Sequence, residues 1–503
     1  MKRFEQNGLA AVFAVSVMMA CSAHADARFV EGEVIVKYRA GVSVDDAKTY
    51  AARGGLTVAR SFGALTEARG AVFSVVRGAL STGELMRRLE ADPNVEAVSP
   101  NYIRTLFYVP NDPKFYRQWS LNNTTADADL DAPQAWEIER GVSDTVVAVI
   151  DTGVDYTHVD LAENMWRNPD ETPNGLDDDG NGIIDDIYGA DFANDNNGGN
   201  DGDPMDIAGH GTNIAGIIGA VGNNGIGIAG VNWEVGIMAL KVFRPDGYAY
   251  DTDILEAINY VLAQKAKGVN IVAVNASYGG PYGSQSDPMN DAIKNLGSAG
   301  IVFCAAAGNN GKNSDVNASY PASYNAANII AVAATDQNDA LAPFSNYGAV
   351  SVDIAAPGVN IYSTHPGSGT LGFSDLLSGT GSAATPTASD SYGSYSGTSM
   401  AAPAVSGAAA LVASRCPAES ASARRAHILR YVDRLSSLKG KTATEGRLNL
   451  NNVLQAECIE DVDSGGGGGE LSVYDSVSLL LYASGFLALG GMIARRRVVP
   501  QEE

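Results

Sequence analysis

The chain has 503 residues, of which 18% are charged and 45% hydrophobic, and it contains 56 glycines. This composition is typical of a loop-rich globular protein with more than one domain, and it excludes a disordered or coiled-coil chain. A formal net charge of −24 excludes a nucleic-acid binder, because such proteins present a basic surface.

The first residues have the order of an export signal. Two basic residues at positions 2 and 3 precede an apolar run over 9–20, and a small-residue cleavage sequence ends at Ala25. We therefore predict a signal peptide over 1–25 and an exported protein, secreted or at the cell surface. A lipoprotein acylated at Cys21 is the alternative.

Export permits disulfides, and three cysteines lie beyond the signal. Cys304 falls in an apolar, strand-like run and is expected to be a buried free thiol. Cys416 and Cys458 bracket the end of the globular part and are a candidate disulfide, although the sequence leaves their pairing open.

Residues 26–107 are predicted to form a small α+β domain. Two strand–helix halves of this size favour a ferredoxin-like fold. The expected strands cover 34–38, 71–76 and 95–98, and the expected helices cover 44–53 and 81–89.

In residues 108–460 nearly continuous apolar strands alternate with helices, one of them expected over 253–267. This alternation predicts a layered α/β domain whose mainly parallel sheet has helices on both faces. Ligands are then expected at the carboxyl ends of the strands. The strands are expected over 145–150, 236–243, 269–275, 301–306, 329–334 and 352–355.

The C-terminal part combines a linker with an apolar segment. Five consecutive glycines within 461–475 predict a flexible linker. An apolar stretch within 476–503, closed by three arginines, predicts a transmembrane tail with its basic end in the cytoplasm. The arrangement resembles bacterial glycine-rich sorting tails, so the membrane contact is either permanent or removed with the tail.

Four polar residues stand where a parallel sheet would bring side chains together. Asp151 ends the first strand of the sheet, His210 lies between glycines at a helix start, and Asn309 follows the strand over 301–306. Ser399 falls in the first turn of an Ala-rich helix, where free N–H groups and the helix dipole favour developing negative charge. Alone the serine is compatible with an ordinary core helix, but an acid, a base and an amide donor together predict nucleophilic catalysis.

These motifs resemble those of the subtilisin-like serine proteases, which carry the same Asp, His, Ser order. The resemblance covers roughly residues 111–452 and implies a seven-stranded-type subtilisin-like sheet, with the first domain as an inhibitory propeptide. It implies Ser399 as nucleophile, His210 as general base and then acid, and Asp151 as the group that orients the imidazole. Asn309 and the Ser399 N–H would stabilise the oxyanion.

The predicted protein is therefore a serine endopeptidase that cleaves polypeptides through an acyl-enzyme and is made as a self-processing zymogen. Asn213 and Ala404 stand where the family usually has histidines, and altered packing rather than lost activity is expected. A calcium-dependent surface binding protein on an inactive protease fold is one alternative. An esterase is another, although no Gly-x-Ser-x-Gly sequence surrounds Ser399.

Substrate binding is expected along the segment after the third strand. By resemblance, the backbone of Ser277, Tyr278 and Gly279 would pair with an extended peptide and read its main chain. The two glycines at 279 and 280 leave room for this approach, and a bulge or turn is the alternative interpretation.

An acidic loop gives the clearest metal signal. Oxygen ligands at alternate positions followed by glycine match the first half of an EF-hand loop, but the twelfth position is Tyr188 instead of glutamate. Remote ligands such as Glu171 or Asp186 would have to complete the shell, and a solvated acidic turn is the alternative. The predicted ligands for a structural Ca²⁺ are Asp177, Asp179, Asn181 and Asp185.

A second, weaker calcium site is implied by the resemblance alone. Its loop is Asn223-Asn224-Gly225-Ile226-Gly227, in which Asn224 would act with the carboxylate of Asp160.

Overall fold

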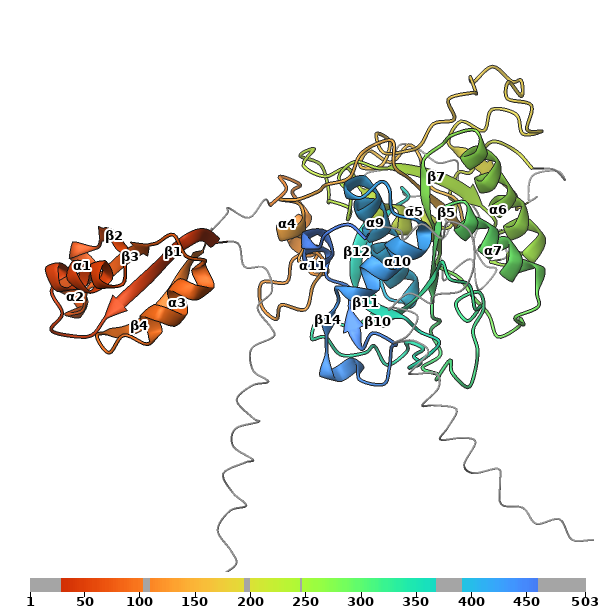
Figure 1. Ribbon diagram of the computed structural model, residues 1–503. Helices are drawn as coiled ribbons and strands as arrows, with labels where there is room; N and C mark the ends of the chain where they lie inside the picture. Colours follow the sequence, from red (N-terminus) through yellow and green to blue (C-terminus); the bar gives the residue numbers. More distant parts are fainter. Residues whose placement is uncertain (1–28, 103–108, 194–199, 245–246, 368–390, 460–503) are drawn as a thin grey trace, which may run out of the picture. The chain divides into compact units, whose positions relative to one another are not determined.

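The computed structural model describes residues 29–102, 109–193, 200–244, 247–367 and 391–459 (Figure 1). The predicted signal peptide, linker and C-terminal tail lie outside these residues. Among the helices that the structure describes, none is long and apolar enough to span a bilayer.

The N-terminal domain is a four-stranded antiparallel sheet with strand order β2-β3-β1-β4, the order of the predicted ferredoxin-like fold. Alternate residues of β1 and one face each of α1 and α3 form its core. The short β2 and α2 were not predicted, because β2 is largely exposed and lacks an apolar pattern. The elements are β1 (Phe29–Tyr38), α1 (Val44–Arg53), β2 (Thr57–Ser61), α2 (Gly63–Arg69), β3 (Phe73–Arg77), α3 (Thr82–Glu90) and β4 (Val95–Tyr102).

The second domain is built on a nine-stranded sheet with order β14-β15-β11-β10-β9-β8-β5-β7-β6. The strands from β11 to β6 are seven parallel strands, which confirms the predicted parallel α/β sheet, and the two-residue strands β15 and β14 extend its edge. The strands are β5 (Val146–Asp151), β6 (Gly189–Asp191), β7 (Gly236–Lys241), β8 (Ile271–Ala276), β9 (Val302–Ala306), β10 (Ile329–Thr335), β11 (Ile354–Pro357), β14 (Asp433–Arg434) and β15 (Gly446–Arg447).

Helices cover both faces of this sheet, as the continuous apolar strands predict. α6 and α7 pack on one face, and α5, α9, α10 and α11 pack on the other (Figure 1). The helices are α4 (Ala132–Ala135), α5 (His210–Gly219), α6 (Asp251–Ala266), α7 (Pro288–Ser298), α9 (Thr398–Arg415), α10 (Ala421–Arg430) and α11 (Leu450–Gln455), with 3₁₀ turns at Phe115–Arg117 and Ser436–Leu438.

The Gly-, Ser- and Thr-rich segment between His365 and Gly397 is predicted from its sequence to be a surface loop, but the structure has a strand at its end. β12 (Ile361–His365) and β13 (Ser391–Tyr395) pair antiparallel in a separate two-stranded sheet. Two aromatic side chains of this hairpin, Tyr362 and Tyr392, lie under the cations of Arg117 and Lys114 at 3.8 and 3.6 Å, which attaches the hairpin to the start of the domain. β13 was not predicted because its sequence, Ser-Tyr-Gly-Ser-Tyr, is rich in residues typical of loops.

A disulfide joins Cys416 to Cys458 across 42 residues, and Cys304 is a buried free thiol, so both expectations are confirmed. The disulfide fixes the last described residues on the end of α9. Glu419 reinforces the attachment, because its Oε1 accepts the N–H of Ile459 at 2.7 Å.

Removing this disulfide should destabilise the domain. Closing a loop of this length restricts the unfolded chain, so replacing Cys416 and Cys458 with Ser should cost about 2–4 kcal/mol of unfolding free energy. Urea unfolding measures this free energy, and a Ser399→Ala background, which the sequence predicts to be inactive, is used for both proteins. Dithiothreitol should produce the same loss in the parent and none in the double variant; equal stability of the two proteins would contradict the prediction.

Candidate active site

Asp151 and His210 form a buried pair at the carboxyl end of the sheet. Asp151 is the last residue of β5 and His210 the first of α5, and their exposed fractions are 1% and 8%. Nδ1 of the imidazole lies 2.7 Å from Oδ1 of the carboxylate. Burial lowers the pKa of His210, but the charge and hydrogen bond of Asp151 outweigh it, so the pKa is raised overall.

Glycines permit this close approach. A side chain at Gly211 would begin 2.0 Å from the carbonyl oxygen of Gly153 and 3.1 Å from Cβ of Asp151. The start of α5 therefore rests on the backbone that follows β5, as the glycines around the histidine suggested.

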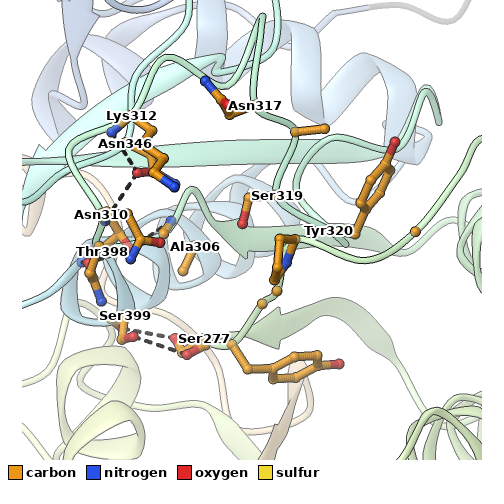
Figure 2. A pocket seen from close by; sticks show the side chains of 18 of the residues that line it. Ser277, Ala306, Asn310, Lys312, Asn317, Ser319, Tyr320, Asn346, Thr398 and Ser399 are labelled. Carbon is orange, nitrogen blue, oxygen red and sulfur yellow. Dashed lines mark hydrogen bonds between the residues drawn. The ribbon is translucent and has the colours of Figure 1, made fainter.

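Ser399 lies in the first turn of α9, beside the segment that extends β8 (Figure 2). Its hydroxyl donates to the carbonyl oxygen of Ser277 at 3.0 Å, and the hydroxyl of Ser277 donates to the carbonyl oxygen of Ser399 at 2.8 Å. These two hydrogen bonds hold the serine turn against one wall of the groove.

Asn309 faces the same turn from the end of β9. Its Oδ1 accepts hydrogen bonds from N and Oγ1 of Thr398 at 2.8 and 2.9 Å, which fixes the direction of the amide. A methyl group on Gly397 would lie 3.4 Å from Nδ2 of Asn309 and 3.5 Å from N of Ser399. Two hydrogen-bond donors thus border one small space beside the serine, the arrangement that an oxyanion requires.

All four residues line one groove with a cavity volume of ≈ 730 Å³. Ser277, Tyr278 and Gly279 form part of its wall. In the part of the chain that the structure describes, the backbone groups of Tyr278 and Gly279 have no backbone partner. Gly279 also packs closely on Tyr320, whose carbonyl oxygen would lie 2.9 Å from a side chain there, so the glycine has a packing role as well.

The acidic loop brings three carboxylates together. Oxygens of Glu171, Asp177 and Asp179 lie within 4.8 Å of one another. Oε2 of Glu171 is buried and has no partner among the described residues, whereas Oε1 accepts the N–H groups of Asp178 and Asp179. This donor set fits a hard cation such as Ca²⁺, and it includes the remote glutamate that the sequence suggested.

Other predicted ligands of the loop have different partners. Asp185 accepts the N–H groups of Asn174 and Gly175, and Nδ2 of Asn181 donates to Asp186 at 2.9 Å. Nζ of Lys267 lies 2.6 Å from Asp179 and supplies one positive charge to the cluster.

The second predicted calcium loop holds two buried carboxylates. Nδ2 of Asn224 donates to Asp160 at 2.9 Å, and Asp112 accepts the N–H groups of Asn223 and Asn224. Burial raises the pKa of Asp160 to about 6, and the nearby charge of Asp112 adds to the rise. A cation would relieve this repulsion.

The two departures from the family pattern lie in the core. Nδ2 of Asn213 donates to the carbonyl oxygen of Thr364 at 3.1 Å, and its Oδ1 is buried without a partner among the described residues. Ala404 borders a cavity of ≈ 10 Å³. Neither lines the groove, which agrees with a packing role.

Sequence reasoning missed Asp206, a buried acid bonded to the loops that carry Asp151 and His210. The only signal was its place four residues before the histidine.

This fold and groove are those of the subtilases, and the chain belongs to that family. The model of the subtilase family matches residues 142–452, and that of the fervidolysin N-terminal prodomain matches residues 16–101. The chain is a subtilisin-like serine endopeptidase that carries an N-terminal prodomain.

Individual relatives agree with this assignment. Thermitase of Thermoactinomyces vulgaris is 37% identical over 349 residues, covering 69% of this chain and all of the relative (100%). The thermophilic serine proteinase of Bacillus sp. strain AK1 is 34% identical, covering 78% of this chain and 80% of the relative. The extracellular protease of Xanthomonas campestris pv. campestris is 37% identical, and the match covers 66% of this chain and 54% of the relative.

A solved structure supports the fold. A protease from Pseudoalteromonas arctica PAMC 21717 has a TM-score of 0.54 and 28% identity, and the match covers 69% of this chain and 99% of the other. The predicted protease fold is thus confirmed, and the alternatives of a non-enzymatic binding protein and an esterase are set aside.

Replacing Gly397 with Ala tests the space between the two donors. The added methyl group makes ordinary contacts with Asn309 and Ser399, so the protein should fold, but an oxyanion no longer fits. We expect kcat for peptide hydrolysis to fall about 10²-fold with little change in KM. Gly393→Ala is the matched control, because a methyl group there also makes only ordinary contacts, of 3.6 Å and longer, and Gly393 does not line the groove. Wild-type kcat in Gly397→Ala would refute the assignment of this space.

Proposed function

We propose that the protein is an exported, calcium-stabilised endopeptidase whose catalytic triad is Ser399, His210 and Asp151. The observation that carries this proposal is the groove in which a buried Asp–His pair, a serine at a helix start and two hydrogen-bond donors meet. The reaction is hydrolysis of a peptide bond through an acyl-enzyme on Ser399.

The proposed mechanism starts with a rotation of the serine side chain. The Ser399 hydroxyl leaves the carbonyl oxygen of Ser277 and turns to Nε2 of His210, which accepts its proton as the oxygen attacks the substrate carbonyl. The imidazolium keeps its Nδ1–H on Asp151, whose buried negative charge stabilises it. Nδ2 of Asn309 and the N–H of Ser399 receive the oxyanion, and His210 then donates its proton to the leaving amine.

An extended peptide would bind by adding a strand. The unpaired backbone groups of Tyr278 and Gly279 offer donors and acceptors next to the serine, and such pairing depends on the substrate's main chain more than on its sequence. Polypeptides are therefore the proposed substrates.

The prodomain match supports synthesis as a zymogen, with residues 26–107 as an intramolecular inhibitor and residues 108–460 as the catalytic domain. We place the cleavage between Tyr102 and Asp112. In self-processing, the catalytic domain would cut the bond that joins it to its own prodomain.

A Ser399→Ala variant tests both catalysis and self-processing. Secreted wild-type protein should begin near residue 108 on N-terminal sequencing and should react with a fluorophosphonate, because the serine is activated by His210. The alanine variant should stay unprocessed and unlabelled. Added wild-type enzyme should process it in trans, which controls for misfolding; an unlabelled wild type would contradict the proposal.

Calcium is proposed as a structural cofactor at two sites. The first uses Asp177, Asp179 and Glu171, with Asn181 as a further predicted ligand, and the second uses Asp160 and Asn224. The predicted ligand Asp185 is left out of the first site, because its carboxylate accepts the N–H groups of Asn174 and Gly175. The unpartnered Glu171 oxygen and the paired buried carboxylates Asp112 and Asp160 support these sites. Bound Ca²⁺ would offset the repulsion within each cluster and so stabilise the folded loops.

Chelation tests this cofactor. In a Ser399→Ala background, EDTA should lower the midpoint of thermal unfolding, because binding at 100 times Kd contributes about 2.7 kcal/mol. A Glu171→Gln, Asp177→Asn double variant should lose part of this response. Asp185→Asn should keep it, since that carboxylate bonds to Asn174 and Gly175. If EDTA does not change the midpoint of thermal unfolding, the loop is an ordinary acidic turn that binds no Ca²⁺.

Export is proposed from the signal sequence and agrees with the name of the extracellular protease among the relatives. The linker at 461–475 and the transmembrane tail at 476–503, which would hold the protein at a membrane, stay predictions from the sequence.

A further inference from the structure

Asp206 is a fully buried acid in the loop that leads into α5. Its exposed fraction is 0%, and it stands four residues before His210. Its carboxylate accepts five hydrogen bonds. Oδ1 accepts from Oγ1 of Thr152 at 3.0 Å and from the N–H groups of Ala208 and Gly209, each at 2.8 Å, and Oδ2 accepts from N and Oγ1 of Thr212 at 2.9 and 2.6 Å.

These hydrogen bonds join the two segments that carry the Asp151–His210 pair. Thr152 follows Asp151 directly, and its hydroxyl also accepts the N–H of Gly211 at 2.9 Å. Thr212 lies in the first turn of α5, and its hydroxyl accepts the N–H of Asp155 at 2.9 Å. One carboxylate therefore holds the end of β5 against the start of α5.

The surroundings of Asp206 suit an anion. Three of its five partners are backbone N–H groups, which only donate, so the oxygens facing them must act as acceptors. Burial raises the pKa of Asp206 overall, and the hydrogen bonds from Thr212 and the backbone offset only part of that rise. The negative charge also lies at a helix N-terminus, where the dipole favours it.

We propose that Asp206 is a positioning residue for His210, which fixes the imidazole on Asp151 and adds a second negative charge that favours the imidazolium formed during catalysis. The proposal rests on the role of His210 as the general base. Asp206 acts through His210, because Asp151, Thr152 and His210 line the groove and Asp206 does not.

The titratable groups near His210 come from several elements. Asp151 ends β5, and Tyr278 follows β8 and lines the same groove. The ring of His365, at the end of β12, would lie 3.2 Å from a side chain at Gly209, the residue before His210. Burial and the charge of Asp151 raise the pKa of Tyr278, so this phenol is neutral. For His210 itself, burial lowers the pKa, and the charges of Asp151 and then Asp206 raise it.

The test is the pH profile of kcat/KM for the mature protein acting on a chromogenic peptide. Asp206→Asn keeps the shape of the side chain and removes its charge. Losing a negative charge destabilises the imidazolium, so His210 deprotonates at lower pH and the acid limb should move down by about half a pH unit. Looser positioning should lower kcat about tenfold with KM nearly unchanged.

Asp155→Asn is the matched control. Asp155 is also buried, at 1% exposure, but its side chain bonds to Thr157 instead of the start of α5. Its acid limb should coincide with that of the wild type. An unshifted acid limb in Asp206→Asn, or an equal shift in Asp155→Asn, would overturn the proposal.

Two further variants cover the case in which Asp206→Asn fails to fold. Thr152→Ala removes one hydrogen bond to Asp206 and should lower kcat, whereas Thr152→Ser keeps the hydroxyl and should restore it; equal kcat values would also overturn the proposal. Fluorophosphonate labelling of wild-type Ser399 separates this result from the proposed function, since a labelled enzyme with an unshifted profile refutes only the role of Asp206.

Discussion

The buried carboxylate of Asp151, which is 1% exposed and lies beside the imidazole of His210, is the constraint on which the rest of the catalytic domain depends. An unpaired charge in such a place would be costly, so Asp151 must keep a hydrogen-bonding partner. The 2.7 Å contact with His210 requires the start of α5 to rest on the backbone after β5, which is why glycine occurs at 211. Ser399, at the start of α9, and Asn309, after β9, then need only reach the same groove.

Loop carboxylates explain part of the large negative charge. Besides Asp206, the side chains of Glu171, Asp177 and Asp112 each accept at least two backbone N–H groups, and Asp315 does the same for residues 349–351. In a domain with long connections, these acids supply the hydrogen bonds that helices and sheets provide elsewhere. The negative charge, which on composition alone argues against nucleic-acid binding, thus also has a structural role: part of it holds loops together.

The sequence sufficed for the features that depend on pattern. Apolar strands alternating with helices place Asp151 and Asn309 at one edge of a parallel sheet, and small residues place Ser399 at the start of a buried helix, so these positions were predictable. Features that depend on which residues a side chain contacts in the folded protein were not predictable. Nothing in residue type shows that Asp206 bonds to Thr152, or that Asp185 bonds to backbone N–H groups instead of facing the acidic cluster. β13 was not predicted because its serine and glycine residues are typical of a loop.

Helix α9 is buried on almost every side, from Met400 through Ala413. The proposed nucleophile, Ser399, is therefore carried by the part of the molecule that tolerates substitution least, because small residues here pack directly against α5 and the sheet. The facing wall of the groove, from Tyr278 to Gly283 and from Asn317 to Tyr320, is built from connections with exposed positions. The residues proposed for the chemistry and the walls that would contact a bound peptide thus lie in separately variable parts of one groove, so the walls can diverge while the residues proposed for the chemistry stay fixed.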